Sequence, residues 1–272
     1  MIELLVAFVF GITFGSFLNV VILRIPKDQS VVFTPSHCYA CNNTLKPWHN
    51  IPLFSWVFLK GRCAYCDTKI SKQYPFIEFI SGVIFVILIQ KYSFSVPIVF
   101  VFLSFSMLLV LAMIDIKYKM VPDSINLLAI VFALLGAWSF EGFATNLQNA
   151  LLFAGGFTLL RFVLSYLLTA SLHKQANKTL RSWTKNYHRY PYVEAMGEGD
   201  IMVAATMGAL LGLELTLVAV FLSAVLALPV MLAVQNKSQE DQRVAFVPFL
   251  ALATFIVYIY DTPILSYIEA NY

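Results

Sequence analysis

Residues 95–115 read SVPIVFVFLSFSMLLVLAMID, an apolar run that ends on the acidic residue Asp115. The run is as long as the ~20 residues that an α-helix needs to cross the hydrocarbon core of a bilayer. We therefore predict a membrane-spanning helix over residues 95–114 with a carboxylate at its edge. A charged side chain beside apolar helices is costly, so an acidic residue at such a position indicates a functional site.

Seven further apolar stretches resemble this one, and they lie at residues 2–23, 76–90, 124–140, 148–171, 200–213, 215–235 and 245–260. The 272 residues are 60% hydrophobic and 12% charged, whereas soluble domains are roughly 45–50% apolar and 25% charged. We predict an all-α polytopic membrane protein with about eight transmembrane helices. Because residues 76–90 and 200–213 are short for a full crossing, six or seven spans are alternatives. The first stretch lacks the basic start and the cleavage site of a signal peptide, so we expect it to be a helix.

Basic residues gather in alternate loops between these stretches. They are Arg24, Lys27, Lys46, Lys60, Arg62, Lys69, Lys72, Lys117, Lys119, Lys174, Lys178, Arg181, Lys185, Arg189, Lys237 and Arg243. The opposite loops contain only Lys91, so the positive-inside rule predicts that the basic loops, together with Asp115 and Asp200, face the cytoplasm. Both termini would then lie outside. The net charge of +3 suits contact with anionic membrane lipids, and nothing indicates nucleic-acid binding.

All four cysteines lie in the first basic loop, as Cys38-Tyr-Ala-Cys41 and Cys63-Ala-Tyr-Cys66. Two such pairs can place four sulfurs around one zinc ion, which stabilises a loop too small for a good apolar core. Two disulfides are the alternative, which a reducing cytoplasm disfavours, and a catalytic zinc would need an open position that four thiolates do not leave. We expect a first transmembrane helix at 1–23, a cytoplasmic zinc-binding domain at 24–75 and a membrane domain that carries Asp115 and Asp200 at 76–272.

Two aspartates lie at the edges of apolar stretches. Asp115 is expected to close its helix before Pro122 starts the next, and Asp200 follows Gly197-Glu-Gly as an N-cap candidate. Either residue alone is most simply a helix cap worth about 1 kcal/mol. Together on one side of the membrane they fit an aspartic protease, in which one carboxyl activates water and the other polarises the carbonyl. Asp123 and Glu198 are rivals on residue type alone.

Other polar residues stand out less clearly. We expect Arg161 to snorkel or to pair with a carboxylate, Ser16 and Asn19 to bond neighbouring helices, and Glu78 to lie at the membrane interface. A long loop is expected over residues 172–199. Its ring-bearing residues, which we expect to rest on the membrane surface, are His173, Trp183, Tyr187, His188 and Tyr190.

Five motifs in order resemble the type IV prepilin peptidase family, also called leader peptidase and N-methyltransferase. They lie at residues 15–26, 35–66, 70–78, 114–123 and 197–212. Two positions depart from the family pattern. Met202 stands where a lysine is usual, and Phe246-Val-Pro-Phe249 stands where the family has Phe-Gly-Pro-Phe.

The resemblance implies that Asp115 and Asp200 are the catalytic pair and that the four cysteines bind a structural Zn²⁺. The family removes short basic leaders from type IV prepilins and type II secretion pseudopilins, on the cytoplasmic side of the bacterial inner membrane. Many members then methylate the new amino terminus with S-adenosyl-L-methionine. The chain contains no Gly-rich dinucleotide fingerprint, so we expect a non-standard methyl-donor site that involves the first loop.

Alternative functions come from other classes. The chain could be a peptidase without methyltransferase activity, or a proton-coupled membrane transporter, since paired acidic groups also mark ion paths. A third alternative is a non-enzymatic assembly factor that docks through its zinc loop and would tolerate loss of both carboxylates.

Overall fold

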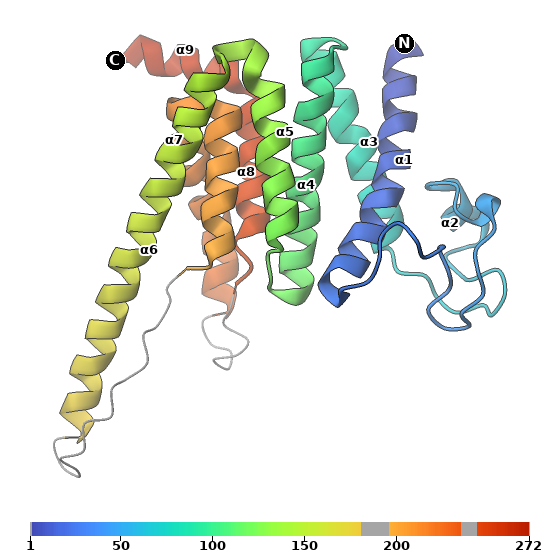
Figure 1. The fold of residues 1–272 in the computed structure, drawn as a ribbon, viewed down its shortest axis with the longest axis horizontal. Coiled ribbons are helices and arrows are strands. Elements are labelled where there is room, and N and C mark those ends of the chain that lie inside the picture. The colour runs from blue at the N-terminus through green and yellow to red at the C-terminus, as the bar shows by residue number, and fades with distance from the viewer. Residues whose placement is uncertain (1, 181–195, 235–243, 272) are drawn as a thin grey trace.

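The computed structural model describes residues 2–180, 196–234 and 244–271, and its elements are helices (Figure 1). The long helices are α1 (Ile2–Arg24), α3 (Gln73–Tyr92), α4 (Val96–Tyr118), α5 (Asp123–Glu141), α6 (Phe143–Leu180), α7 (Glu198–Val234), α8 (Val247–Ile259) and α9 (Asp261–Asn271). Between α1 and α3 lie the short elements η1 (Ile25–Lys27), η2 (Pro47–His49) and α2 (Phe54–Phe58). The prediction of an all-α membrane protein is confirmed.

Among the described residues, five helices are long and apolar enough to cross a membrane, namely α1, α3, α4, α6 and α7. The pair α8 and α9, bent by 77°, would make a sixth span, and α5 is apolar but shorter. Residues 76–90 belong to a helix of 20 residues, so this stretch is not short as expected. The expected start of the long loop at residue 172 is also wrong, because α6 continues to Leu180. Residues 181–195, which carry Trp183, Tyr187, His188 and Tyr190, lie outside the described residues.

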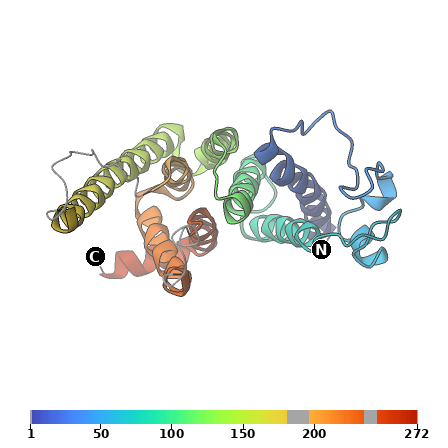
Figure 2. The ribbon, with the colours of Figure 1, turned by 90° about the horizontal axis from the view of Figure 1, so that it is seen from below.

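Helix α7 is a hairpin of two arms rather than one rod. Gly212 has φ 73° and ψ −169°, a conformation that only glycine adopts readily. The hydroxyl of Thr216 donates to the carbonyl of Met207 at 3.2 Å, although nine residues of continuous helix would rise about 13.5 Å. The two arms therefore lie side by side, as Figures 1 and 2 show in orange. They correspond to the stretches predicted at residues 200–213 and 215–235.

Small residues let α1 and α3 approach closely. A Cβ on Gly11 would lie 2.7 Å from the Cα of Gly82, and one on Gly15 would lie 2.7 Å from the Cα of Glu78. Such glycine contacts are typical of packed membrane helices. The amide of Asn19 donates to the carbonyl of Tyr74 at 3.1 Å, which confirms its expected role between helices. Figure 2 shows this pair at one side of the bundle, with α6, α7 and α8 at the other.

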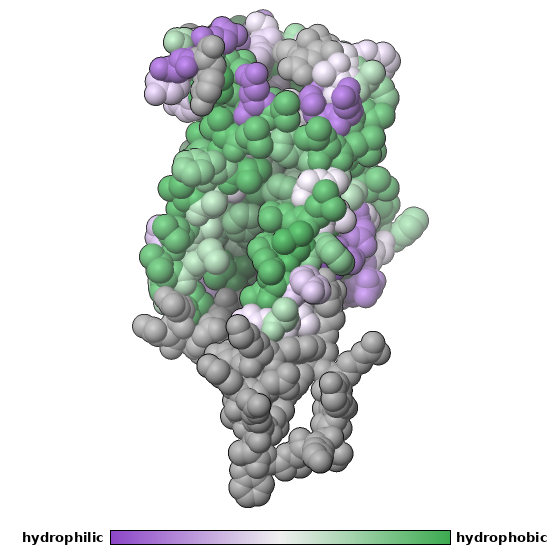
Figure 3. Space-filling model, turned by 90° about the vertical axis from the view of Figure 1, so that its left-hand side faces the viewer, coloured by the Kyte–Doolittle hydropathy of each residue, from purple (hydrophilic) through white to green (hydrophobic). Residues whose placement is uncertain are grey.

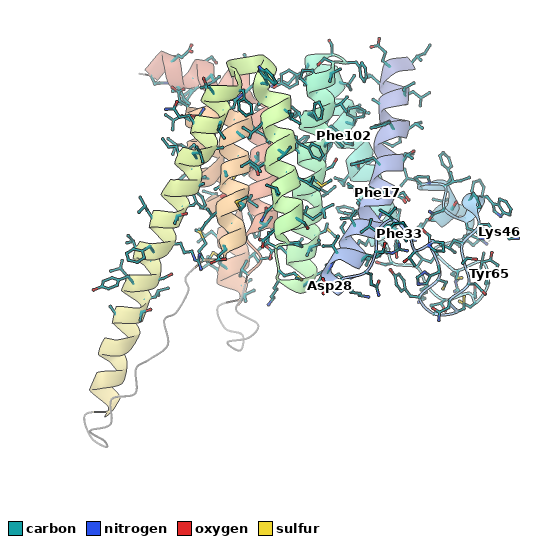
Figure 4. All side chains as sticks on the ribbon, viewed as in Figure 1. Phe17, Asp28, Phe33, Lys46, Tyr65 and Phe102 are labelled. Atoms are coloured by element: carbon teal, nitrogen blue, oxygen red, sulfur yellow. The ribbon has the colours of Figure 1, made fainter. Side chains whose placement is uncertain are left out.

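Helix α4 connects the two sides of the bundle. It packs on α5 and α8, and also on α1 and α3. The ring of Phe102, fully buried in α4, has its centroid 4.4 Å from that of Phe85 in α3. Figure 4 shows Phe102 near mid-height of the bundle, while Lys46 and Tyr65 lie on the loop module beside α1. Helix α4, which carries Asp115 near its carboxyl end, is thus held between both halves.

The outer surface fits a bilayer. Many large apolar side chains are exposed, including Leu151, Leu159, Phe162 and Leu167 on α6. Figure 3 shows a broad hydrophobic band below a hydrophilic rim. Figure 1 places the N-terminus, α9 and the α3–α4 and α5–α6 connections at one end, with the α4–α5 turn at the other. The alternation predicted from the basic loops is therefore present in the fold.

Candidate active site

The four cysteines lie together in the module between α1 and α3. Their Sγ atoms are all within 4.8 Å of one another, and those of Cys38 and Cys66 are 3.8 Å apart. A tetrahedron of Zn–S bonds of about 2.3 Å has sulfur–sulfur edges of about 3.8 Å. All four are free thiols. The donor set therefore fits a closed metal site and not the alternative of two disulfides.

The module is built from two equivalent turns, one around each cysteine pair. In the first, the N–H of Cys38 donates to the carbonyl of Asn43 at 3.0 Å, and Asn42 donates back to Cys38 at 2.9 Å. In the second, Cys63 donates to Thr68 at 2.9 Å and Asp67 donates back at 3.1 Å. Asn42 and Asp67 both have positive φ, near 56° and 59°. Each turn directs two sulfurs toward the same point.

Hydrogen bonds favour the thiolate form, which binds metal ions, at two of the four cysteines. Hydrogen bonds from the side chain and backbone of Thr68 lower the pKa of Cys66 to about 6. Backbone N–H groups of Cys41 and Ala40 also lower the pKa of Cys38. Although the N–H of Asn43 favours the thiolate of Cys41, burial and the neighbouring sulfurs raise its pKa to about 11. A cation at the centre would remove this repulsion between sulfurs.

Arg24 fastens the module to the membrane helices. It ends α1, is 4% exposed, and its guanidinium donates to the carbonyls of Ser30 (3.1 Å), Thr34 (2.7 Å) and Pro35 (3.1 Å). An arginine suits this role because its planar guanidinium presents five N–H donors and can bind several carbonyl groups at once. The start of the cysteine loop is therefore held against the foot of α1.

Asp115 lies in the last turns of α4 and does not close the helix, which continues to Tyr118. The residue is 7% exposed. Its Oδ2 accepts the backbone N–H of Val247, the first residue of α8, at 3.1 Å, and the N–H of Phe246 also donates to this carboxyl. The first N–H groups of a helix lack partners within the helix and favour an anion. Asp115 thus caps a distant helix.

Asp200 lies in the first turn of α7, which begins at Glu198. The expectation that Asp200 is the N-cap is therefore wrong, because the helix begins two residues earlier. Its carboxyl accepts the backbone N–H of Gly197, the reach-back bond of a capping box. Asp200 is half-buried. This bond keeps its carboxyl at the amino end of α7.

A close backbone approach brings the two aspartates together. A Cβ on Gly199 would overlap the side chain of Val121 in the α4–α5 turn, and the amide of Asn126 reaches the carbonyl of Gly199 at 3.5 Å. As a result the carboxyl groups of Asp115 and Asp200 are close enough to interact electrostatically.

The two rival carboxylates, Asp123 and Glu198, are exposed, unlike Asp115 and Asp200. Asp123 is exposed in the first turn of α5. The side chain of Glu198 is 78% exposed and forms an ion pair with Arg161 of α6 at 3.0 Å. The expectation that Arg161 pairs with a carboxylate is therefore confirmed. This pair places a cation near the start of α7, where Met202 supplies none.

Sequence reasoning missed the part played by Val247. Its N–H, not its side chain, contacts Asp115. The backbone donor is therefore kept although this chain has valine where the family has glycine. The sequence did contain a signal for the start of α8, because Pro248 is a residue type that is common in the first turn of a helix. Nothing in the sequence indicated which carboxylate that helix end would meet.

The fold and these two sites define a polytopic helical membrane protein with a four-cysteine cluster that could hold a metal ion and a carboxylate pair at one end of its bundle. Two family models match most of the chain. The Bacterial Peptidase A24 N-terminal domain matches residues 9–92, which include the cysteines. The type IV leader peptidase family matches residues 102–232, which include both aspartates.

Full-length relatives agree with these matches. A prepilin leader peptidase/N-methyltransferase of Neisseria gonorrhoeae is 30% identical over 93% of this chain and 88% of its own length. A protein of the same name from Stutzerimonas stutzeri is 30% identical over 97% of this chain and 93% of its own length. Another, from Bacillus subtilis strain 168, is 27% identical over 96% of each chain. No solved structure matches the chain. The chain belongs to the type IV leader peptidase family.

Proposed function

We propose that the chain is a membrane aspartic endopeptidase that removes the leader peptide of type IV prepilins or pseudopilins. The observation that carries this proposal is the approach of Asp115 and Asp200 at one end of the bundle. These residues come from the end of α4 and the start of α7, beside the turn that the basic-loop pattern assigns to the cytoplasm.

The pair supplies both halves of acid–base hydrolysis. Two carboxyl groups that share a site hold one proton between them, so one acts as base and the other as acid. The ionised carboxyl takes a proton from a water molecule while the protonated one donates to the scissile carbonyl oxygen. The N–H groups of Phe246 and Val247 hold Asp115 in place for this step.

The fold also suits the substrate class. A prepilin places a short basic leader before an apolar helix, and the exposed apolar side chains of α6 and α7 would face such a helix within the lipid. The acidic pair would meet the leader junction at the membrane boundary. We propose that this boundary is the cytoplasmic face of the bacterial inner membrane.

A second activity follows from family membership. We propose that the chain then methylates the new amino terminus with S-adenosylmethionine. In that reaction the amine nitrogen bonds to the methyl carbon, the carbon–sulfur bond breaks with its electron pair on sulfur, and the amine loses a proton to water.

A structural Zn²⁺ held by Cys38, Cys41, Cys63 and Cys66 would order residues 24–75, between the first helix (1–23) and the peptidase domain (76–272).

The experiment is co-expression of the chain with a prepilin, followed by mass measurement of the pilin. We expect Asp115→Asn and Asp200→Asn each to lower leader removal on the order of 10³-fold or more. Asp123→Asn makes the same chemical change at an exposed rival and should leave leader removal intact. Undiminished processing by both variants would refute the peptidase assignment and favour a transporter or an assembly factor.

A further inference from the structure

A cavity lies between the cysteine module and the neighbouring ends of α1, α3 and α4. Its volume is about 490 Å³, and its lining includes Leu23 of α1, Cys63 of the module, Tyr74 of α3 and Lys117 of α4. Cavities that bind small molecules and cofactors measure about 300–1,000 Å³. The cavity is separate from the contacts of Asp115 and Asp200, so the peptidase reaction does not account for it.

The cavity wall contains buried polar groups. Glu78, 6% exposed, accepts the N–H of Leu53 at 2.7 Å. Nδ1 of His49 and Nε2 of Gln73 are also buried, and neither has a hydrogen-bond partner among the described residues. Buried polar atoms in native proteins are nearly always paired. These two atoms at one cavity leave hydrogen-bonding capacity that a polar ligand could satisfy.

Aromatic rings line the same space. Trp56, Tyr74 and His49 all contribute to the wall. The indole N–H of Trp56 donates to the carbonyl of Ile70 at 3.4 Å. Gly61, with φ 67°, packs so closely that an added Cβ would lie 2.8 Å from this ring. Trp56 is therefore held in position, which suits stacking on a flat heterocycle.

We propose that this cavity binds the adenosyl group of S-adenosylmethionine, an inference that rests on the proposed methyl transfer. The chemistry of the lining matches each part of that molecule. The aromatic rings offer stacking surfaces for adenine, and the buried carboxyl of Glu78 suits a cationic sulfonium or ammonium group. Lys27, Lys69 and Lys117 on the wall offer positive charge for its carboxylate.

The position of the cavity explains how one chain carries out two reactions. Asp115 and Lys117 are two residues apart on α4, which is about 200° around a helix of 3.6 residues per turn. The carboxylate faces α8, while the lysine lines the cavity. The two sites therefore lie on opposite sides of the same helix end. A freed amino terminus needs only to pass around this end.

Equilibrium dialysis of the full-length, zinc-loaded protein in detergent against radiolabelled S-adenosylmethionine tests the proposal. We expect Gln73→Leu and Glu78→Gln each to weaken binding at least tenfold. Gln29→Leu makes the same change on an exposed residue that does not line the cavity, and should bind like the unchanged protein. Zinc content and thermal unfolding identify any variant that has lost its fold.

Ultraviolet crosslinking of the unchanged protein gives a result that needs no variant. A labelled peptide that contains lining residues, from 23–27, 37–78 or Lys117, supports the cavity, and a label found only elsewhere overturns it. Undiminished binding by both folded cavity variants also overturns it, while leaving the proposed function intact. If the unchanged protein binds no methyl donor, the methyltransferase part of the proposed function fails, whatever the outcome for leader cleavage.

Discussion

Asp115 and Val247 are 132 residues apart in the chain, yet the backbone N–H of Val247 donates to Oδ2 of Asp115 at 3.1 Å. The carboxylate at the end of α4 thereby occupies the amino end of α8. An anion there satisfies backbone donors that the helix cannot pair internally. The simple interpretation of Asp115 as a helix cap is thus compatible with a catalytic role, because the cap bonds orient the carboxyl group.

Proline at position 247 would remove the N–H that bonds to Asp115. Val247 is the first residue of the helix, a position where proline is tolerated. A hydrogen bond to a charged group contributes about 1.5–3 kcal/mol, so we expect Val247→Pro to lower kcat for leader cleavage by about 10- to 100-fold. Val247→Ala keeps the N–H and should retain most activity. Equal rates for the two variants would show that this bond does not matter.

The two glycines before Asp200 provide a matched pair. A Cβ on Gly199 would overlap Val121, whereas one on Gly197 would meet only Oδ2 of Asp200 at an ordinary 3.6 Å. Overpacking costs about 1–3 kcal/mol, and it would push Asp200 away from Asp115. We expect Gly199→Ala to reduce leader cleavage at least tenfold and Gly197→Ala to reduce it much less. Cleavage assays on the two purified variants make the comparison, and the reverse order would contradict this packing.

Metal content provides a direct test of the cysteine module. We expect one zinc ion per purified chain by elemental analysis, and less than half of that in Cys63→Ser. His37 lies beside Cys38, and its Nδ1 is 3.1 Å from the carbonyl of Pro35, so His37→Ala should retain the metal. Full zinc content in Cys63→Ser would exclude the four-sulfur site.

An ion pair at the opposite end joins the two halves of the bundle. Nζ of Lys91 in α3 donates to Oδ1 of Asp261 at 2.5 Å and to the carbonyl of Ile259 at 2.7 Å. Both side chains are mostly buried, at 23% and 26% exposed. We expect Lys91→Met to destabilise the protein by about 1–3 kcal/mol, seen as a lower Tm in detergent. Lys46→Met, on the exposed module, should leave Tm unchanged; equal Tm values for the two variants would contradict a structural role of the ion pair.

Much of the architecture could be predicted from the sequence because its causes are local. The apolar runs produced helices at each predicted stretch, and the glycine at 212 separates the two runs at residues 200–213 and 215–235. The paired cysteine spacing predicted four converging sulfurs, since each turn closes on its own backbone bonds. Helix ends were less accurate: α4 continues past Asp115 until Lys119 adopts the left-handed conformation and bonds back to the carbonyl of Asp115, and α7 begins before Asp200.

Composition and spacing thus determined the class of protein, the cysteine cluster and the two acidic candidates. Only the tertiary structure decided that Asp115 meets the amino end of α8, that Gly199 packs on Val121 to bring Asp200 close, and that a cavity lies between the cysteine module and the ends of α1, α3 and α4. These relationships join residues far apart in the chain. They depend on which helix faces pack together, and hydrophobic periodicity within one segment does not encode that choice.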